Sequence, residues 1–564
     1  MSDFSRLRER NNLAALAGAA VVVVICLFSH LGAIGLVGPD EPRYAWIARA
    51  MASSGDWVTP RLYGQPWFEK PVLYYWAGGA GFLFHLPAEW AARLPSAFAA
   101  LAVALAIGWL GWKHYGAESE PLASAWLIGP LFFSTSVAAI GFARAASPDM
   151  LFSAALALAM ASAAAVLRRR GALRRWADAA THGDASEYAS LALFGVWLGL
   201  AVLAKGPAGV VLAGGAVGTW ALATGRWRDG FRLAHPIAIA AFCVVALPWY
   251  VVCALRNPDF IHIFIFQHNF ERYLTPMFQH RQPFWYFVPI LILGMVPWTA
   301  GLWPVAQGAM RRWREKSFSD SPGFFFACWA AFPLLFFSFS QSKLPGYILP
   351  AFPPLALLIA VGLGREISPA PRTEPAGSSS RWASVGIGLT WVVLSLFAIH
   401  FLKRLPHSVD DGAGRTILVM AAFGIVAGVA VALLGRLGNR AFLTLSLLMV
   451  AVFTEAAGLR VLPAFDPQLS ARFHADMLRN DRYPDRVFTF DLTRSWQYGL
   501  DFYLERKVPE WSPSDTRAAL VLTNPQGLAE IRKMGRIEGA LDEPYEGIVY
   551  VPVFPAAPNQ SNAK

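Results

Sequence analysis

Charge and cysteine are both scarce in this sequence. Charged residues make up 15% of its 564 residues, whereas hydrophobic residues make up 55%. The four cysteines all lie inside apolar runs and form no CxxC pair, so they indicate neither a disulfide nor a redox compartment. The sequence also lacks a Walker loop, a Rossmann glycine pattern and a zinc-protease helix. Long apolar runs are abundant instead, and they predict a polytopic α-helical membrane protein.

The formal net charge of +11 does not indicate a nucleic acid partner. Most of the excess lies in short arginine clusters between apolar runs, as the positive-inside rule expects of a membrane protein. No basic face with interleaved aromatic residues accompanies them. We therefore expect membrane lipids, and no nucleic acid, among the partners of this chain.

The apolar runs predict about thirteen transmembrane helices, since a crossing needs about 20 apolar residues. They lie near 13–37, 89–112, 121–141, 149–167, 187–204, 206–224, 235–254, 284–307, 322–340, 346–364, 382–402, 414–435 and 440–462. The first run follows three arginines like a signal peptide, but it is long enough to span and lacks a convincing cleavage site. We interpret it as a retained helix. Residues 71–86 are too short for a crossing and predict an interfacial or re-entrant helix.

The arginine clusters also predict the orientation. Clusters at 168–175, 226–232 and 311–316 fall on one side of the predicted helices, which is then cytoplasmic. The opposite, periplasmic side receives loops 38–88 and 255–283. We therefore expect a bacterial inner-membrane protein whose charged loops face the periplasm.

Two domains are predicted. Residues 1–463 form the transmembrane domain, and residues 464–564 are polar enough for a small periplasmic soluble α/β domain. Its predicted strands lie at Arg486–Asp491 and Ala518–Leu522, with helices near 469–480 and 526–534. A Pro-, Ser- and Gly-rich segment at 365–381 predicts a flexible linker.

The stretch 38–76 holds an unusual density of both signs of charge beside a hydrocarbon phase, where ionisable groups are costly. Asp40 and Arg43 are spaced i, i+3, so they share one helix face. A carboxylate and a guanidinium that bind one phosphorylated ligand fit this spacing. Asp40 fits equally well as the N-cap of a helix that ends at Gly55.

Further charged residues fall on the same predicted side. Glu69 and Lys70 precede a proline, and aromatic neighbours suggest that they lie at the membrane interface. Together the cations form a set able to grip phosphates. Its members are Arg43, Lys70, Lys205, Arg272 and Lys343, with Tyr347 beside the last. Asp149 adds a carboxylate, although an aspartate at a helix start is most often a cap.

These motifs resemble those of bacterial membrane glycosyltransferases of the aminoarabinose–lipid A transferase type, relatives of the protein O-mannosyltransferases. The resemblance rests on DEPRYAWIARAM, GDWVTPRL, FEKPVLYYW, SPDM, KGP, HNFERY, HRQPFWYF and SKLPGYILP, in this order through about 38–360. It implies a C-type glycosyltransferase fold that inverts the anomeric carbon of a polyprenyl-phosphate sugar. It also implies catalytic roles for the residues at five positions, namely Asp40, Arg43, Glu69, Lys70 and Asp149.

One position departs from that pattern. The resemblance implies a metal-ligand histidine paired with the glutamate, but that position reads Asn269 here, with His268 one residue earlier. Glu69 and His268 are therefore the candidates for a divalent metal such as zinc. No other cofactor is expected.

We accordingly expect an enzyme that transfers a sugar from undecaprenyl phosphate to lipid A or another envelope glycan. The leaving group is a lipid phosphate, whose charge the cations would meet. Two alternatives remain open. One is a protein or polysaccharide glycosyltransferase of the same fold, and the other is a transporter or lipid flippase. A transporter predicts charge near mid-membrane and often two related halves, whereas this chain concentrates charge on one face.

Overall fold

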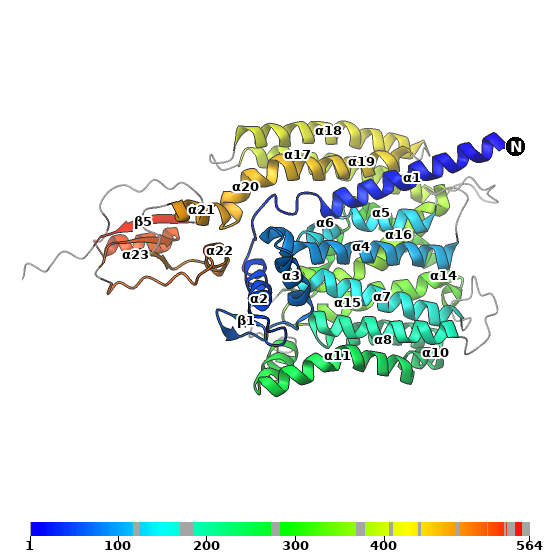
Figure 1. Ribbon diagram of the computed structural model, residues 1–564. Coiled ribbons are helices and arrows are strands. Elements are labelled where there is room, and N and C mark those ends of the chain that lie inside the picture. Colours follow the sequence, from blue (N-terminus) through cyan, green and yellow to red (C-terminus); the bar gives the residue numbers. More distant parts are fainter. Residues whose placement is uncertain are drawn as a thin grey trace, which may run out of the picture.

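The computed structural model describes residues 2–116, 124–169, 185–271, 282–367, 378–404, 410–437, 441–480, 486–515, 517–534, 537 and 548–554. A large helical bundle carries a small domain at one end, and α1 begins at the opposite end (Figure 1). Helices α2 and α3 lie at the end that faces the small domain, whereas α10 lies at the other end. This arrangement agrees with the predicted sidedness of the loops.

The bundle is almost entirely helical. Its first half contains α1 (Ser2–Phe28), α4 (Ala88–Tyr115), α5 (Ala125–Ser134), α6 (Val137–Ala143), α7 (Pro148–Arg169), α8 (Ala185–Lys205), α9 (Ala208–Thr224), α10 (Trp227–Phe231), η3 (Arg232–Ala234) and α11 (Pro236–Arg256). Its second half contains η4 (His262–Glu271), η5 (Phe284–Tyr286), α13 (Phe287–Gly294), η6 (Trp298–Gly301), α14 (Leu302–Arg314), η7 (Phe318–Asp320), α15 (Pro322–Ser338), η8 (Pro345–Ala351), α16 (Phe352–Ile367), α17 (Ser378–Leu402), α18 (Asp411–Arg436), α19 (Ala441–Ala456) and η9 (Ala457–Val461).

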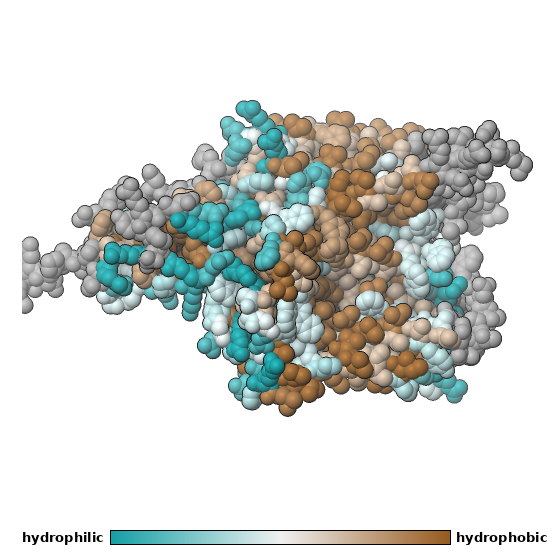
Figure 2. Space-filling model, viewed as in Figure 1, coloured by the Kyte–Doolittle hydropathy of each residue, from teal (hydrophilic) through white to brown (hydrophobic). Residues whose placement is uncertain are grey.

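Within the described residues, eight helices are long and apolar enough to cross a membrane, or up to ten if each of two bent helix pairs is one span. Three shorter apolar helices lie at Leu13–Phe28, Ala208–Thr224 and Pro322–Ser338. Each of the thirteen predicted spans coincides with one of these helices or pairs, so the polytopic helical fold is confirmed. Apolar surface covers the bundle, and hydrophilic surface gathers where the bundle meets the small domain (Figure 2).

Two predicted spans are not straight. The 121–141 span bends by 62° between α5 and α6, and the 284–307 span bends by 108° between α13 and α14. The second break contains Pro297, which has no N–H for a helical hydrogen bond. Hydropathy alone detects the apolar run but not the bend. The last span also continues beyond its predicted end at 462, through η9 into α20 (Leu462–Leu469).

Two short helices and a hairpin precede α4. Helix α2 (Asp40–Ser54) ends at Gly55, whose φ of 71° is the left-handed conformation that favours glycine. A short hairpin follows, with β1 (Arg61–Leu62) antiparallel to β2 (Gln65–Pro66). Its two-residue turn places Tyr63 and Gly64 at positive φ, as a tight hairpin requires. Helix α3 (Leu73–Leu83) is the short helix predicted at 71–86.

The small domain is α/β, as predicted. Its sheet has the order β3-β4-β5, in which β3 (Val487–Phe490) is parallel to β4 (Ala519–Thr523) and β5 (Val549–Val553) is antiparallel to β4. Helices α21 (Arg472–Asn480) and α23 (Pro525–Lys533) match the predicted helices. Helix α22 (Arg494–Leu504) and strand β5 were not predicted from the sequence. The boundary between the two predicted domains, at 463, remains a prediction.

Candidate functional site

Asp40 does not cap α2. It is the first residue of the helix, the capping position is Pro39, and no side chain makes a capping hydrogen bond. The capping interpretation is therefore wrong. The Asp40 carboxylate instead lies 2.5 Å from Nη2 of Arg43, one turn along the same face. About half of the side chain remains exposed (53%), so the carboxylate can reach a ligand as well as its partner.

Arg43 is the centre of the cluster. Its side chain is only 9% exposed, and Nη2 also lies 3.0 Å from Oε2 of Glu69. The guanidinium carbon lies 5.3 to 5.7 Å from the ring centres of Tyr44, Trp67 and Tyr498, a geometry that favours a cation. Its Nε has no hydrogen-bond acceptor among the described residues. One donor of a buried arginine is thus left for a ligand oxygen.

A second ion pair joins the end of α8 to the start of α7. Nζ of Lys205, at the end of α8, pairs with Oδ1 of Asp149 in the first turn of α7. The same Nζ lies 5.0 Å from the centre of the Tyr347 ring. A Cβ on Gly346 would lie 3.0 Å from the Asp149 carboxylate carbon, so glycine lets this backbone approach closely. The structure therefore brings Asp149, Lys205 and Tyr347 together.

Electrostatics link the two ion pairs. The charges of Arg43, Glu69, Lys70 and Asp149 all act on the Asp40 carboxyl. The surrounding protein removes enough water from Asp40 to raise its pKa above the usual value, and the nearby Arg43 charge opposes that rise. Lys70, whose Nζ lies 3.9 Å from Oε1 of Glu69, also acts on Asp149. The five predicted catalytic residues thus form one electrostatic cluster.

The remaining predicted phosphate ligands are placed less directly. Lys343 is buried, and its Nζ donates to the carbonyls of Ser340, at 2.6 Å, and Gln282, at 3.1 Å. An ammonium has three donors, so one N–H remains for a ligand. Arg272 lies outside the described residues.

The described residues contain no group of three or more His, Cys, Asp or Glu that could hold a metal ion. Glu69 already faces two cations, Arg43 and Lys70, which neutralise the charge that a divalent ion needs. His268 lies in η4, on a different element. Glu69 and His268 belong to no described group of that size, so the metal site at this pair stays a prediction, and we derive no step through a metal.

Glu41 has a structural role that sequence reasoning missed. Its carboxylate pairs with Arg93 at 2.6 Å and accepts from the amides of Val37 and Ala146. Arg93 is 2% exposed and also donates to three carbonyls between α1 and α2. Glu41 thus ties the start of α2 to α4 and to the loop between α6 and α7, which fixes where Asp40 and Arg43 point. The separation of Glu41 and Arg93 in the sequence does not indicate this ion pair.

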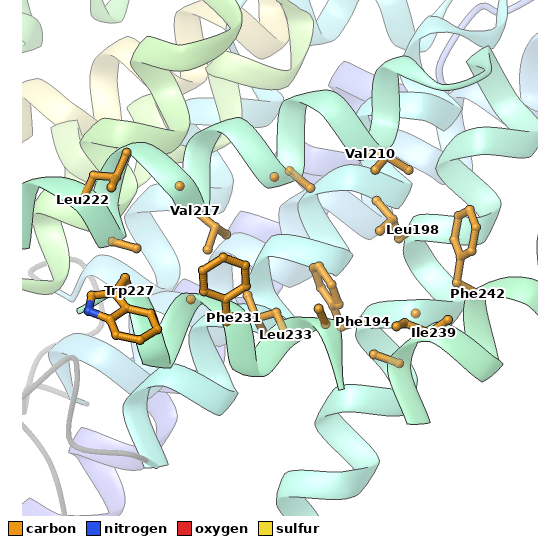
Figure 3. A pocket seen from close by; sticks show the side chains of 18 of the residues that line it. Phe194, Leu198, Val210, Val217, Leu222, Trp227, Phe231, Leu233, Ile239 and Phe242 are labelled. Atoms are coloured by element: carbon orange, nitrogen blue, oxygen red, sulfur yellow. The ribbon is translucent and has the colours of Figure 1, made fainter. Parts of the chain in front are cut away.

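An apolar pocket of about 690 Å³ lies apart from the charged cluster, between α8, α9, α10, η3 and α11 (Figure 3). None of the predicted site residues lines it. Its wall follows α9 from Val210 to Leu222, with Phe194 and Phe242 from the neighbouring helices. Helices α8 and α9, which both line it, meet at Lys205. An apolar groove thus runs along the helices whose junction carries one cation of the site.

Comparison with known proteins agrees with this arrangement. Residues 14–264 match the family model described as dolichyl-phosphate-mannose-protein mannosyltransferase. The chain is 30% identical over 570 residues to an undecaprenyl phosphate-alpha-4-amino-4-deoxy-L-arabinose arabinosyl transferase of Edwardsiella ictaluri, covering 95% of each protein. A protein of the same name from Pectobacterium carotovorum is 31% identical over 82% of this chain and 80% of its own length.

The fold has also been seen before. The crystal structure of ArnT from Cupriavidus metallidurans bound to undecaprenyl phosphate superposes with a TM-score of 0.75 and 23% identity. The match covers 96% of this chain and 97% of that protein. The apo structure of the same protein gives a TM-score of 0.71. These matches show that the whole chain, the helical bundle together with the small domain, has a known architecture.

Proposed function

This chain belongs to the family of undecaprenyl phosphate-alpha-4-amino-4-deoxy-L-arabinose arabinosyl transferases, and from that premise we propose the reaction that its charged cluster performs. The protein transfers 4-amino-4-deoxy-L-arabinose from undecaprenyl phosphate to lipid A. The transfer takes place on the periplasmic side of the bacterial inner membrane.

A single observation carries the proposal: buried cations and an exposed carboxylate meet at one end of an apolar bundle. Arg43 is nearly buried but keeps one unsatisfied donor, and Asp40 beside it is half exposed. Lys70 and Lys205 add positive charge to the same cluster. Such a site binds a phosphate whose negative charge grows as it leaves.

The proposed chemistry is a single displacement. The bond between the anomeric carbon and the phosphate oxygen breaks, and the lipid phosphate leaves with the electron pair. The acceptor oxygen forms the new bond to the anomeric carbon from the opposite face. With a hydroxyl acceptor, Asp40 takes the proton as a general base. With a phosphate acceptor, which is already ionised, Asp40 orients the acceptor.

The leaving phosphate needs cations that are already in place. Arg43, held among aromatic rings, and Lys70 are the first candidates, with Lys205 and Tyr347 on the far side of the cluster. Lys343 can add its remaining N–H. Because these groups are fixed before the reaction, they stabilise the developing charge without reorganisation.

The apolar groove gives the isoprenoid tail of the donor a place to lie. It follows α9 away from Lys205, so a lipid whose phosphate sits in the cluster can extend along it. Gly214 and Gly218 line the groove, and a Cβ at either position would meet no atom within 4 Å. The groove is therefore open at these glycines.

Mass spectrometry of lipid A from cells with and without the protein tests the proposal, together with transfer by purified protein in detergent. We expect lipid A to gain aminoarabinose only when the protein is present. Unchanged lipid A with a modified protein or polysaccharide would instead support a transferase of the same fold with another acceptor. No transfer to any acceptor would contradict the proposal.

A further inference from the structure

Helix α22 of the small domain packs against α2, the helix that carries Asp40 and Arg43. The two elements come from opposite ends of the chain. The tip of the β1–β2 hairpin also contacts α22, since the centre of the Tyr63 ring lies 6.5 Å from the centre of the Tyr498 ring. The small domain thus reaches the charged cluster directly.

We propose that Tyr498 is a positioning residue of the transfer site, through which the small domain holds the Arg43 guanidinium toward Asp40 and Glu69. This inference rests on the proposed function, because it assigns Arg43 to the donor phosphate. It implies that the site is complete only while the small domain is docked.

Tyr498 supplies one wall around Arg43. The guanidinium carbon lies 5.7 Å from the Tyr498 ring centre, close to its distances from Tyr44 and Trp67. Those two rings belong to the membrane domain, so Tyr498 is the contribution of the small domain. Among the described residues, Tyr498 Oη makes no hydrogen bond, and its ring faces are what it contributes. A ring beside a buried guanidinium attracts the cation and restricts its rotation.

A separate set of contacts docks the domain. Tyr63 Oη donates to Oδ2 of Asp501 at 2.6 Å, while Gln497 and the Val508 amide satisfy Oδ1. Tyr503 Oη accepts from the Leu36 amide at 2.7 Å and donates to a carboxylate of α4 at 2.8 Å. Because Asp501 and Tyr503 follow Tyr498 within the next turn and a half of α22, their bonds to the membrane domain set the position of its ring. Docking and positioning therefore belong to different residues of one helix.

An ion pair between α2 and the residue that follows α22 provides a matched control. Arg49 pairs with Glu505 at 3.1 Å, but the Glu505 side chain is 70% exposed. Exposed pairs of this kind contribute little to stability. A substitution at Glu505 therefore changes the residue at the end of α22 without removing the docking bonds of Asp501 and Tyr503 or the ring beside Arg43.

The test compares Tyr498→Leu, Tyr498→Phe and Glu505→Gln in the full-length protein, with melting temperature recorded for each. Tyr498→Leu should lower kcat by about five- to thirtyfold, the value of a partly desolvated cation–π contact. Tyr498→Phe keeps the ring and should restore most of the rate. Glu505→Gln should match the wild type. In an Arg43→Lys background, Tyr498→Leu should lower kcat much less, because the guanidinium that the Tyr498 ring contacts is already gone.

A second readout does not depend on sugar transfer. Phenylglyoxal modifies accessible arginines, and peptide mapping reports how fast Arg43 reacts. Tyr498→Leu should speed this reaction, whereas Tyr498→Phe should not. If the wild-type protein transfers no sugar but Tyr498→Leu still speeds the labelling of Arg43, the proposed function is contradicted and the positioning role of Tyr498 stands. Unchanged labelling, or equal loss of rate in both arginine backgrounds, would overturn the inference.

Discussion

Asp40 and Glu41 are neighbours in the chain, yet they belong to two different regions of the molecule. Glu41 faces inward, where Arg93 and two backbone amides satisfy its carboxylate completely. Asp40 faces the charged cluster, where it is half exposed and its partner Arg43 keeps a donor unused. One carboxylate anchors the helix, and the other is held ready for a ligand.

The difference between the two carboxylates shows how a site can hold its side chains in place and still leave polar groups free to bind a ligand. A buried ion pair whose lone pairs and protons are all satisfied resists movement. That rigidity is what allows the adjacent turn of α2 to leave Asp40 and Arg43 incompletely satisfied. The anchor and the reactive pair therefore should respond differently to the same chemical change.

Replacing Asp40 with Asn should give the largest effect on activity. The side chains are nearly equal in size, but the amide cannot accept a proton or carry charge. We expect transfer to a hydroxyl acceptor to fall by about 10²- to 10⁴-fold, the usual loss for a general base. The measurement is sugar transfer from undecaprenyl-phosphate aminoarabinose in detergent, with the melting temperature expected to stay unchanged. Near-normal turnover would remove Asp40 from the chemistry.

The same substitution at the next residue should act on stability. Glu41→Gln leaves Arg93 buried without a counter-charge, and breaking a buried pair in this way costs about 3–5 kcal/mol. We expect a clear drop in melting temperature and less protein in the membrane. If Glu41→Gln melts like the wild type while Asp40→Asn unfolds, the two roles are reversed.

Lys70→Met should weaken the binding of the donor. A hydrogen bond to a charged group contributes about 1.5–3 kcal/mol, or roughly ten- to a hundredfold in affinity. We expect that loss in the dissociation constant of undecaprenyl phosphate, without loss of folding. Lys113→Met provides the control, because Lys113 lies in the last turn of α4, at the far end of the bundle. Equal effects of both substitutions would argue against a specific phosphate contact.

Filling the groove should have a smaller effect, and one that depends on donor length. Gly218→Phe adds a ring where the glycine meets no neighbour, so the fold should tolerate it. It should raise KM for a long-chain donor by about tenfold, the value of one or two buried methylene groups. A donor with a short isoprenoid chain should be unaffected. Gly308→Phe on α14, another open position, is the matched control; if it raises KM equally, the groove does not hold the tail.

The pH dependence should show the smallest change. Because the pKa of Asp40 is raised, transfer to a hydroxyl should begin to fall, as the pH decreases, above the usual aspartate range. The charge of Arg43 opposes that rise, so Arg43→Gln should raise the pKa of Asp40 further and move the acidic limb to higher pH. Arg61→Gln, at a half-buried arginine of β1 that pairs with Asp56, should leave the limb in place. A limb that moves to lower pH would contradict the proposed pairing.

Much of this protein could be predicted from its sequence. Each of the thirteen apolar runs contains a helix, and the polar C-terminal segment folds as an α/β domain. The five predicted catalytic residues form one cluster, because loops on the same side of a membrane bundle are confined to the same small area. These residues are Asp40, Arg43, Glu69, Lys70 and Asp149. The capping interpretation of Asp40 failed because sequence spacing cannot distinguish the capping position from the first helical residue.

The sequence by itself determined the membrane fold, since apolar length and charge placement are local properties of a chain in a bilayer. Only the tertiary structure decided which carboxylate became the anchor and which stayed open. Glu41 meets Arg93, and Arg43 meets Tyr498, across separations that no periodic pattern records. The physical reason is that hydropathy fixes how each segment meets lipid, whereas the pairing of buried charges depends on which segments pack together.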